Sequence, residues 1–156
     1  DLSVYENVLL GCHSHSAGTL GRLLRRPSGE IRDLVDSLIE RVGLTHDRET
    51  RARELDFGHQ KLLEIARALA LKPRLLLLDE PAAGITGAEA DELVRIIHEV
   101  NRKATVVVVD HDMQFVRMLG GRVTVLHQGA ILREGPVDEV LADAKVREVY
   151  IGSRAR

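Results

Sequence analysis

Aromatic residues and cysteine are scarce in this chain. Aromatic side chains make up 3% of its 156 residues and tryptophan is absent, so a surface that stacks nucleic-acid bases is not expected. The net charge of −2 likewise gives no general attraction to nucleic acid or to an anionic membrane. The single cysteine, Cys12, excludes an intramolecular disulfide and fits a reducing compartment. No segment approaches the roughly 18 consecutive apolar residues that a membrane-spanning helix needs.

A phosphate-binding loop of the form GxxxxGK followed by Ser or Thr is also missing. The nearest glycine cluster, residues 18–21, has no lysine after it, so the chain lacks the backbone amides and the lysine that cradle a triphosphate. The sequence opens on Asp1 rather than on methionine and shows no basic-then-apolar leader. We therefore expect residue 1 to be a cut in a longer chain, and the chain to be a fragment rather than a truncated gene product.

Helix and strand signals alternate along the sequence. Leu2–Leu10 can open a helix, and Gly11–Gly29, which has no periodicity, is expected to be a loop. Apolar residues at helical spacing predict helices over Glu30–Val42, Gln60–Leu71 and Ala88–Val100. Two short runs that are apolar throughout, Leu75–Leu78 and Thr105–Val109, are typical of parallel strands covered on both faces. The remaining elements expected are a helix at Met113–Leu119, a hairpin of Arg122–His127 with Ala130–Glu134, and short helices near Val137–Leu141 and Val146–Tyr150.

Two carboxylates come directly after the first predicted strand. Asp79 and Glu80 follow four leucines and precede Pro81. A hard oxygen ligand such as Asp79 can hold Mg²⁺, usually through water. Glu80 can polarise a water that attacks a γ-phosphate. The alternative is a strand that merely ends in an acidic turn, but the leucines and Pro81 favour nucleotide hydrolysis.

Two further segments fit the same chemistry. His111 follows the second strand, and open α/β sheets bind ligands at the carboxyl ends of their strands, so His111 is predicted to lie beside Glu80. There it can hydrogen-bond the γ-phosphate and hold water and base in line, whereas a lone histidine at a strand end is usually a solvated loop residue. Leu55–Gln60, which contains Gly58, precedes a long helix. Such a turn is an anion site or, taken singly, merely a helix start.

In this order, the three segments resemble the ABC ATPase family over essentially the whole chain. Leu55–Gln60 is similar to the signature segment, whose usual form is LSGGQ, and Pro81–Thr86 to the D-loop. The resemblance implies an α/β fold. Residues 1–72 would be a helical subdomain that ends with the signature segment and its helix. Residues 73–156 would be the C-terminal half of a RecA-like P-loop NTPase core with a mostly parallel sheet.

The same resemblance implies the roles of individual residues. Glu80 and His111 would be catalytic, as the family's catalytic glutamate and switch histidine, and Asp79 would hold Mg²⁺ through water as the Walker B aspartate. ATP of the opposite subunit would be contacted by the signature residues Asp56, Phe57, Gly58, His59 and Gln60, and by Ala83, Gly84 and Thr86 of the D-loop.

Further stretches narrow the resemblance to importers. Leu62–Leu69, Asp79–Gly84, His111–Met113 and Val149–Gly152 are similar to importer ATPases for branched-chain amino acids, while Val123–Gly129 leans towards the related urea importers. The resemblance implies a transport-coupled ATPase that uses ATP and Mg²⁺, is cytoplasmic, and is peripheral on the inner face of the cell membrane. Its partners would be a second ABC ATPase subunit, identical or different, the permease subunits and, indirectly, a solute-binding protein, with no nucleic acid. The solute itself is not encoded here.

Three positions depart from the family pattern. Asp56 stands where a serine normally contacts the γ-phosphate, His59 replaces a glutamine, and Thr86 replaces the D-loop aspartate. A negative charge that faces a triphosphate weakens binding unless it is protonated, bridged by metal or turned away. Two alternatives therefore stay open: a non-transport ABC ATPase and a catalytically inactive ABC-like regulatory module. Without a P-loop, the chain alone is expected to be inactive.

Overall fold

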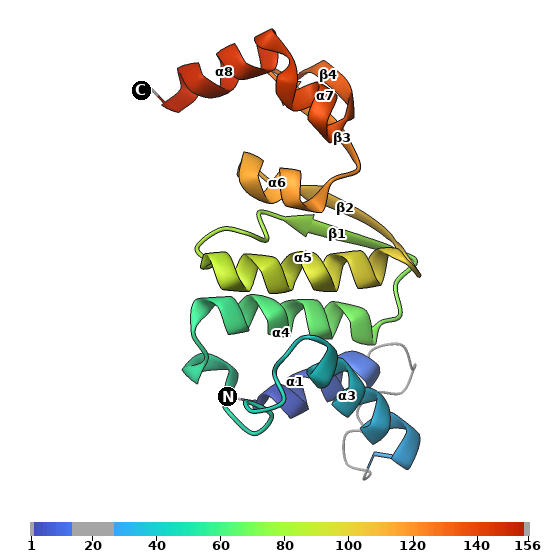
Figure 1. Cartoon of the computed structure of the whole chain (residues 1–156). Coiled ribbons are helices and arrows are strands. Elements are labelled where there is room, and N and C mark those ends of the chain that lie inside the picture. Colours follow the sequence, from blue (N-terminus) through green and yellow to red (C-terminus); the bar gives the residue numbers. More distant parts are fainter. Residues whose placement is uncertain (1, 14–26, 155–156) are drawn as a thin grey trace. The chain divides into compact units, whose positions relative to one another are not determined.

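The computed structural model describes residues 2–13 and 27–154, and it divides into two compact units, Asp1–Val109 and Asp110–Arg156. The first unit is mainly helical and carries one pair of strands. Its elements are α1 (Val4–His13), α3 (Gly29–Arg41), the 3-10 turn η1 (Ala52–Glu54), α4 (Phe57–Ala70), β1 (Leu75–Asp79), α5 (Gly87–Asn101) and β2 (Thr105–Val109). Within this unit, α5 lies between the strands and α4, and α1 and α3 lie on the other side of α4 (Figure 1).

The helices follow the apolar periodicity of the sequence. Each predicted inward stripe is buried except for Ile31 and Leu34 in the first half of α3, which are half-buried. The buried members are Val35, Leu38 and Ile39 of α3, Leu62, Ile65, Ala66 and Leu69 of α4, and Leu93, Ile96, Ile97 and Val100 of α5. The side chain of Ser28 accepts a hydrogen bond from the N–H of Ile31 and begins α3, and Gly43, with φ of +75°, follows its end.

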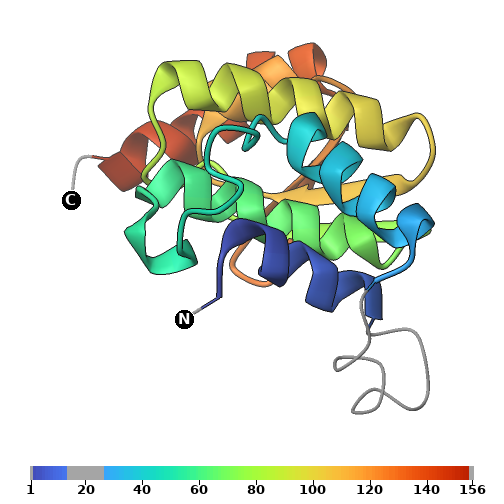
Figure 2. The same cartoon turned by 90° about the horizontal axis from the view of Figure 1, so that it is seen from below.

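The expected loop at Gly11–Gly29 was wrong at both ends. Gly11 belongs to α1 and Gly29 begins α3, while residues 14–26 of that range lie outside the described part of the chain. A Cβ built on Gly11 would lie 3.0 Å from Cβ of Ala70 and 3.0 Å from the carbonyl oxygen of Arg67, both on α4. Glycine is therefore used here for close helix packing rather than for a turn. Seen from below, α1 and α3 lie against α4 (Figure 2).

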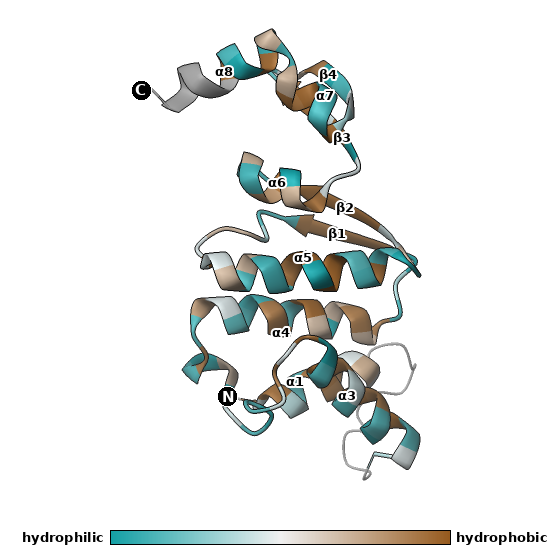
Figure 3. Cartoon of the chain, in the orientation of Figure 1, coloured by the Kyte–Doolittle hydropathy of each residue, from teal (hydrophilic) through white to brown (hydrophobic). Residues whose placement is uncertain are grey.

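The strands β1 and β2 are parallel and joined by the crossover helix α5, which confirms the predicted β-α-β unit. Their register pairs Leu75 with Thr105 and Asp79 with Val109. The expectation that both strand faces are covered was wrong. Leu76 is buried on the α5 side, but Leu75, Leu77, Val107 and Val109 on the other face are exposed, because the helices of this unit cover one face only. Figure 3 shows how apolar both strands are.

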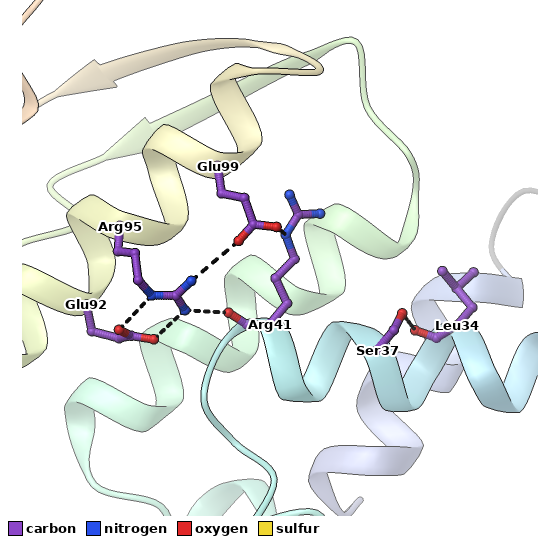
Figure 4. Close-up of polar contacts among 6 residues, drawn as sticks. All are labelled: Leu34, Ser37, Arg41, Glu92, Arg95 and Glu99. Atoms are coloured by element: carbon purple, nitrogen blue, oxygen red, sulfur yellow. Dashed lines mark hydrogen bonds and ion pairs between the residues drawn. The ribbon is translucent and has the colours of Figure 1, made fainter.

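A polar link ties α3 to α5 within the first unit (Figure 4). Arg95 donates from Nη2 to the carbonyl oxygen of Arg41 at 3.0 Å, and Arg41 ends α3. That carbonyl has no partner within its own helix, so Arg95 acts as a C-terminal cap from a distant helix. Glu92 holds the Arg95 guanidinium at 2.6 Å, and Arg41 forms an ion pair with Glu99 at 2.8 Å.

The second unit contains α6 (Met113–Leu119), β3 (Arg122–His127), β4 (Ala130–Pro136), α7 (Val137–Ala142) and α8 (Ala144–Arg154). The predicted α6 and hairpin are confirmed. Gln128 and Gly129 have φ of 50° and 77°, so both central residues of the turn are left-handed, as in a type I′ hairpin. Among the described helices of the whole chain, none is long and apolar enough to cross a membrane.

Candidate nucleotide site

Asp79 and Glu80 lie where parallel strands usually present ligand-binding side chains. Asp79 is the last residue of β1 and Glu80 follows it, and both are exposed. The N–H of Glu80 donates to the carbonyl oxygen of Val109 at 2.7 Å, so the backbone of Glu80 is tied to the end of β2. Glu80 also has φ of 45°, a left-handed conformation that non-glycine residues rarely adopt. Strained backbone of this kind clusters at functional sites, which supports a role for Glu80.

The chain then turns into α5 through the predicted D-loop. The N–H of Ala83 donates to the carbonyl oxygen of Glu80 at 3.1 Å, and Gly84 has φ of +75°. Thr86 begins α5 with a capping box: its N–H donates to the Glu89 carboxylate at 2.5 Å, and its hydroxyl accepts from the N–H of Glu89. Thr86, which replaces the family's aspartate, therefore acts as a helix cap.

The predicted signature segment belongs to the helix rather than preceding it. The helix α4 begins at Phe57, not at Gln60 as expected, because the carboxylate of Asp56 caps its N-terminus. Leu55 is buried, and its carbonyl oxygen accepts a hydrogen bond from Nε2 of Gln60 at 2.9 Å. Phe57, Gly58, His59 and Gln60 thus form the first turn of a long helix.

Asp56, which replaces the serine of the family pattern, turns towards its own helix. Its Oδ1 accepts from the N–H of His59 at 2.8 Å, and its Oδ2 lies 2.7 Å from Nδ1 of the same residue. These contacts with the backbone and then the ring of His59 lower the pKa of Asp56 below its ordinary value of 3.8. Asp56 is therefore ionised at neutral pH and keeps its negative charge.

The structure brings the signature turn and the D-loop together. A Cβ built on Gly84 would lie 2.9 Å from Cε1 of Phe57, so the aromatic ring lies directly against the D-loop backbone. A Cβ on Gly58 would meet the Glu89 carboxylate at 1.8 Å. Gly84 combines this close approach with φ of +75°, which favours glycine, whereas at Gly58 the flexible Glu89 side chain would have to move. The contacts join the N-termini of α4 and α5 within one subunit.

Glu89 is a site residue that the sequence analysis missed. Its pKa is lowered by the hydroxyl and then the backbone N–H of Thr86, and it interacts electrostatically with Asp56 and His59. The sequence pattern Thr86-x-x-Glu89 is sufficient to predict the capping box. The sequence does not predict that the Glu89 carboxylate lies at Gly58, because that contact joins residues of different helices.

His111 lies in the second unit, two residues beyond the end of β2. It is 74% exposed, with Nδ1 3.9 Å from Oδ1 of Asp110. Asp112 caps α6 by accepting from the N–H groups of Gln114 and Phe115. The approach of His111 to Glu80 stays a prediction, since the two residues belong to different units.

The donor set fits Mg²⁺ only if most of its ligands come from outside the protein. No group of three His, Cys, Asp or Glu side chains within the described ranges could hold a metal ion. Asp79 supplies an exposed carboxylate at the end of β1. Mg²⁺ commonly keeps several waters and binds one or two carboxylates together with substrate phosphates, so this arrangement is compatible with it.

Comparison with known proteins supports the resemblance to ABC ATPases. Residues 1–83 match the ABC transporter family. The chain is 33% identical over 97% of its length to LivG of Escherichia coli strain K12, a high-affinity branched-chain amino acid transport ATP-binding protein. It is 32% identical over the same share to BraF of Pseudomonas aeruginosa, which has the same description. It spans 63% of the length of each relative.

Solved structures agree on the fold. A nucleotide-free ATP-binding cassette from an ABC transporter superimposes with a TM-score of 0.78 at 28% identity, covering 96% of this chain and 62% of that one. The ADP conformation of MJ1267, also an ATP-binding cassette, gives a TM-score of 0.74 at 29% identity, covering 97% and 63%. The predicted α/β class, with its parallel β1–β2 pair, is thereby confirmed.

Proposed function

Because this chain belongs to the ABC transporter family, we propose that it is part of the ATP-hydrolysing subunit of an importer for branched-chain amino acids or a related small polar solute. The similarity to LivG and BraF supports this substrate class. The proposal includes the location that was expected from the resemblance, on the inner face of the cell membrane, and a complex with permease subunits and a second ATPase subunit. The subdomain division at residue 72 remains part of the proposal.

The observation that carries the proposal is the placement of Asp79 and Glu80. Both lie at the carboxyl end of a parallel strand, and the Glu80 backbone is tied to β2 by its bond to Val109. Glu80 would accept the proton of the attacking water, and His111 would hydrogen-bond the γ-phosphate and align that water. Mg²⁺, held through water by Asp79, would supply charge stabilisation at the phosphates.

A second subunit would complete the site. The signature turn at Gly58 and the D-loop residues Ala83, Gly84 and Thr86 would face the nucleotide bound to that subunit. Closing and reopening of the pair would drive the permease. Since the phosphate cradle of a P-loop is not in this sequence, we propose that the chain alone neither binds ATP tightly nor hydrolyses it.

The test is a chimera in which this chain replaces the matching residues of Escherichia coli LivG. Cells that lack LivG and carry the chimera should regain uptake of branched-chain amino acids, and the purified complex should hydrolyse ATP. Glu80→Gln, which keeps shape but removes the base, should leave less than about a tenth of that ATPase activity while nucleotide binding is retained. His111→Ala should behave in the same way.

The outcomes separate the alternatives. A folded chimera that assembles with the permease and binds ATP but never hydrolyses it would favour the inactive regulatory module. Hydrolysis without uptake of any branched-chain amino acid would contradict the proposed coupling of this chain to the permease subunits. Full activity of the Glu80→Gln variant would remove Glu80 from the catalytic role.

A further inference from the structure

A cleft opens at the amino ends of β1 and β2, at the edge of the strand pair opposite to the candidate nucleotide site. Its volume is about 400 Å³, and it is lined by Arg74, Asn101, Lys103, Ala104 and Thr105. The loop from α4 into β1 and the loop from α5 into β2 lie together at this end of the first unit (Figure 1). Every lining residue belongs to that unit, so the second unit is not needed to form the cleft.

The side chains of this cleft offer hydrogen-bond donors that the fold does not use. The Arg74 guanidinium and the Lys103 ammonium can only donate. The Asn101 amide and the Thr105 hydroxyl can donate as well. None of these four side chains has a hydrogen-bond or ion-pair partner among residues 2–13 and 27–154. The backbone of the loop, in contrast, is fixed: the N–H of Lys103 donates to the carbonyl oxygen of Val100 at 2.9 Å, and that of Thr105 to the carbonyl oxygen of Arg74 at 3.0 Å.

The positive charge at the cleft is not neutralised by neighbouring carboxylates. The carboxylate closest in sequence to the cleft, that of Glu99, is already bound by Arg41 and Arg95. Two more exposed cations, Lys72 and Arg102, flank the lining residues. The C-terminal end of α5 offsets only part of this charge, because a helix end carries about half an elementary charge. The cleft therefore favours an anion.

We propose that this cleft binds a phosphate group, carried by a soluble molecule or by an anionic lipid headgroup. A guanidinium such as that of Arg74 matches two phosphate oxygens with parallel donors, and Lys103, on the other loop, supplies a second charge. Asn101 and Thr105 would donate to the remaining oxygens. The volume lies within the roughly 300–1,000 Å³ of small-molecule sites, which leaves room for a group attached to the phosphate. The proposal does not depend on the nucleotide site at the opposite strand ends.

The experiment is equilibrium dialysis of the full 156-residue chain against radiolabelled pyrophosphate, at neutral pH and about 0.1 M salt. Pyrophosphate presents phosphate oxygens without a base or sugar. Mg²⁺ is omitted, so Asp79 cannot attract the probe through a metal ion. We expect saturable binding at one site per chain. Arg74→Gln and Lys103→Gln should each raise the Kd about tenfold, as expected for the loss of a charge-assisted hydrogen bond.

Matched variants separate the cleft from its general charge. Lys72→Gln and Arg102→Gln each remove one positive charge from an exposed neighbour that does not line the cleft. They should change the Kd about twofold at most, because exposed charges are screened by salt. Thr105→Val removes a donor without changing charge and should raise the Kd roughly fivefold. Thermal unfolding should give similar Tm values for all these variants, since the altered side chains are exposed.

A second arm distinguishes the two sources of phosphate. Vesicles of phosphatidylcholine, with and without phosphatidylglycerol, are sedimented with the chain and the same variants. Retention on the phosphatidylglycerol vesicles that is lost in Arg74→Gln and Lys103→Gln, but kept in the flanking variants, would assign a lipid headgroup. Pyrophosphate binding without such retention would assign a soluble phosphorylated ligand.

Two results would overturn the proposal. Equal losses in the cleft variants and the flanking variants would show diffuse attraction by surface charge instead of a site. The proposal would also fail if pyrophosphate showed no saturable binding up to about 10 mM and the vesicles retained no chain.

Discussion

The ring of Phe57 lies directly against Gly84: a Cβ added to this glycine would be 2.9 Å from Cε1 of the ring. Gly84 also has φ of +75°, which disfavours any residue with a Cβ. Gly84→Ala should therefore lower the free energy of unfolding by about 1 kcal/mol or more. Denaturant unfolding of the purified chain measures this change.

Gly87→Ala is the matched control for that variant. Gly87 begins α5 three residues later, and a Cβ there meets no atom within 4 Å. This substitution should be neutral or slightly stabilising, since alanine has the higher helix propensity. In a Phe57→Ala background, the steric part of the Gly84→Ala loss should disappear and the backbone part remain. A loss that is identical in both backgrounds would show that the ring contact contributes nothing.

Gly58 and Glu89 should be thermodynamically coupled. A Cβ at Gly58 displaces the Glu89 carboxylate and with it one half of the capping box. With Glu89 present, Gly58→Ala should therefore leave the free energy of unfolding almost unchanged or lower it. In a Glu89→Ala background the same change should stabilise by roughly 0.5–1 kcal/mol through helix propensity alone. A double-mutant cycle by thermal unfolding gives the coupling, and additive effects would contradict it.

Asp56 should make stability depend on pH under acid conditions. Its folded-state pKa lies below the ordinary 3.8, so its contribution is present above that value and is lost as the pH falls through the lower folded-state pKa. Asp56→Asn keeps a capping oxygen but does not titrate. The wild type should exceed this variant in stability at pH 7 and lose the advantage progressively in acid. Unfolding curves between neutral pH and about pH 2 test this, and parallel pH profiles would exclude it.

The open face of the β1–β2 pair should cause self-association of the isolated chain. Apolar strands with an unpaired edge recruit other chains, and exposed apolar area adds to this tendency. Leu77 is 67% exposed on this face and Leu126, on β3, is 72% exposed. Leu77→Lys should raise the concentration at which oligomers form, whereas Leu126→Lys, matched in exposure, should not. Light scattering distinguishes them, and a stable monomer of the wild type would show that this face is protected.

Local pattern was sufficient to predict most elements. The strand Thr105–Val109 and the helix Met113–Leu119 have the predicted bounds, and the hairpin turns at Gln128 and Gly129. These elements depend on neighbouring residues: an apolar run, an Asp cap and a turn-forming pair. The family resemblance was likewise available from the sequence, because it depended only on the order of Leu55–Gln60, Asp79–Glu80 and His111 along the chain.

Sequence pattern was insufficient wherever distant residues meet. Periodicity cannot show that Gly11 lies against α4, or that only one face of β1 is covered by its own unit. Those outcomes follow from how whole helices pack.

The sequence by itself determined the β-α-β unit and the presence of Asp79 and Glu80 at the end of its first strand. Only the tertiary structure decided that the Phe57 ring lies against Gly84 and the Glu89 carboxylate against Gly58. The reason is physical. Secondary structure and helix caps are selected by short-range propensity and pattern, whereas a contact between the starts of two helices depends on how those helices pack.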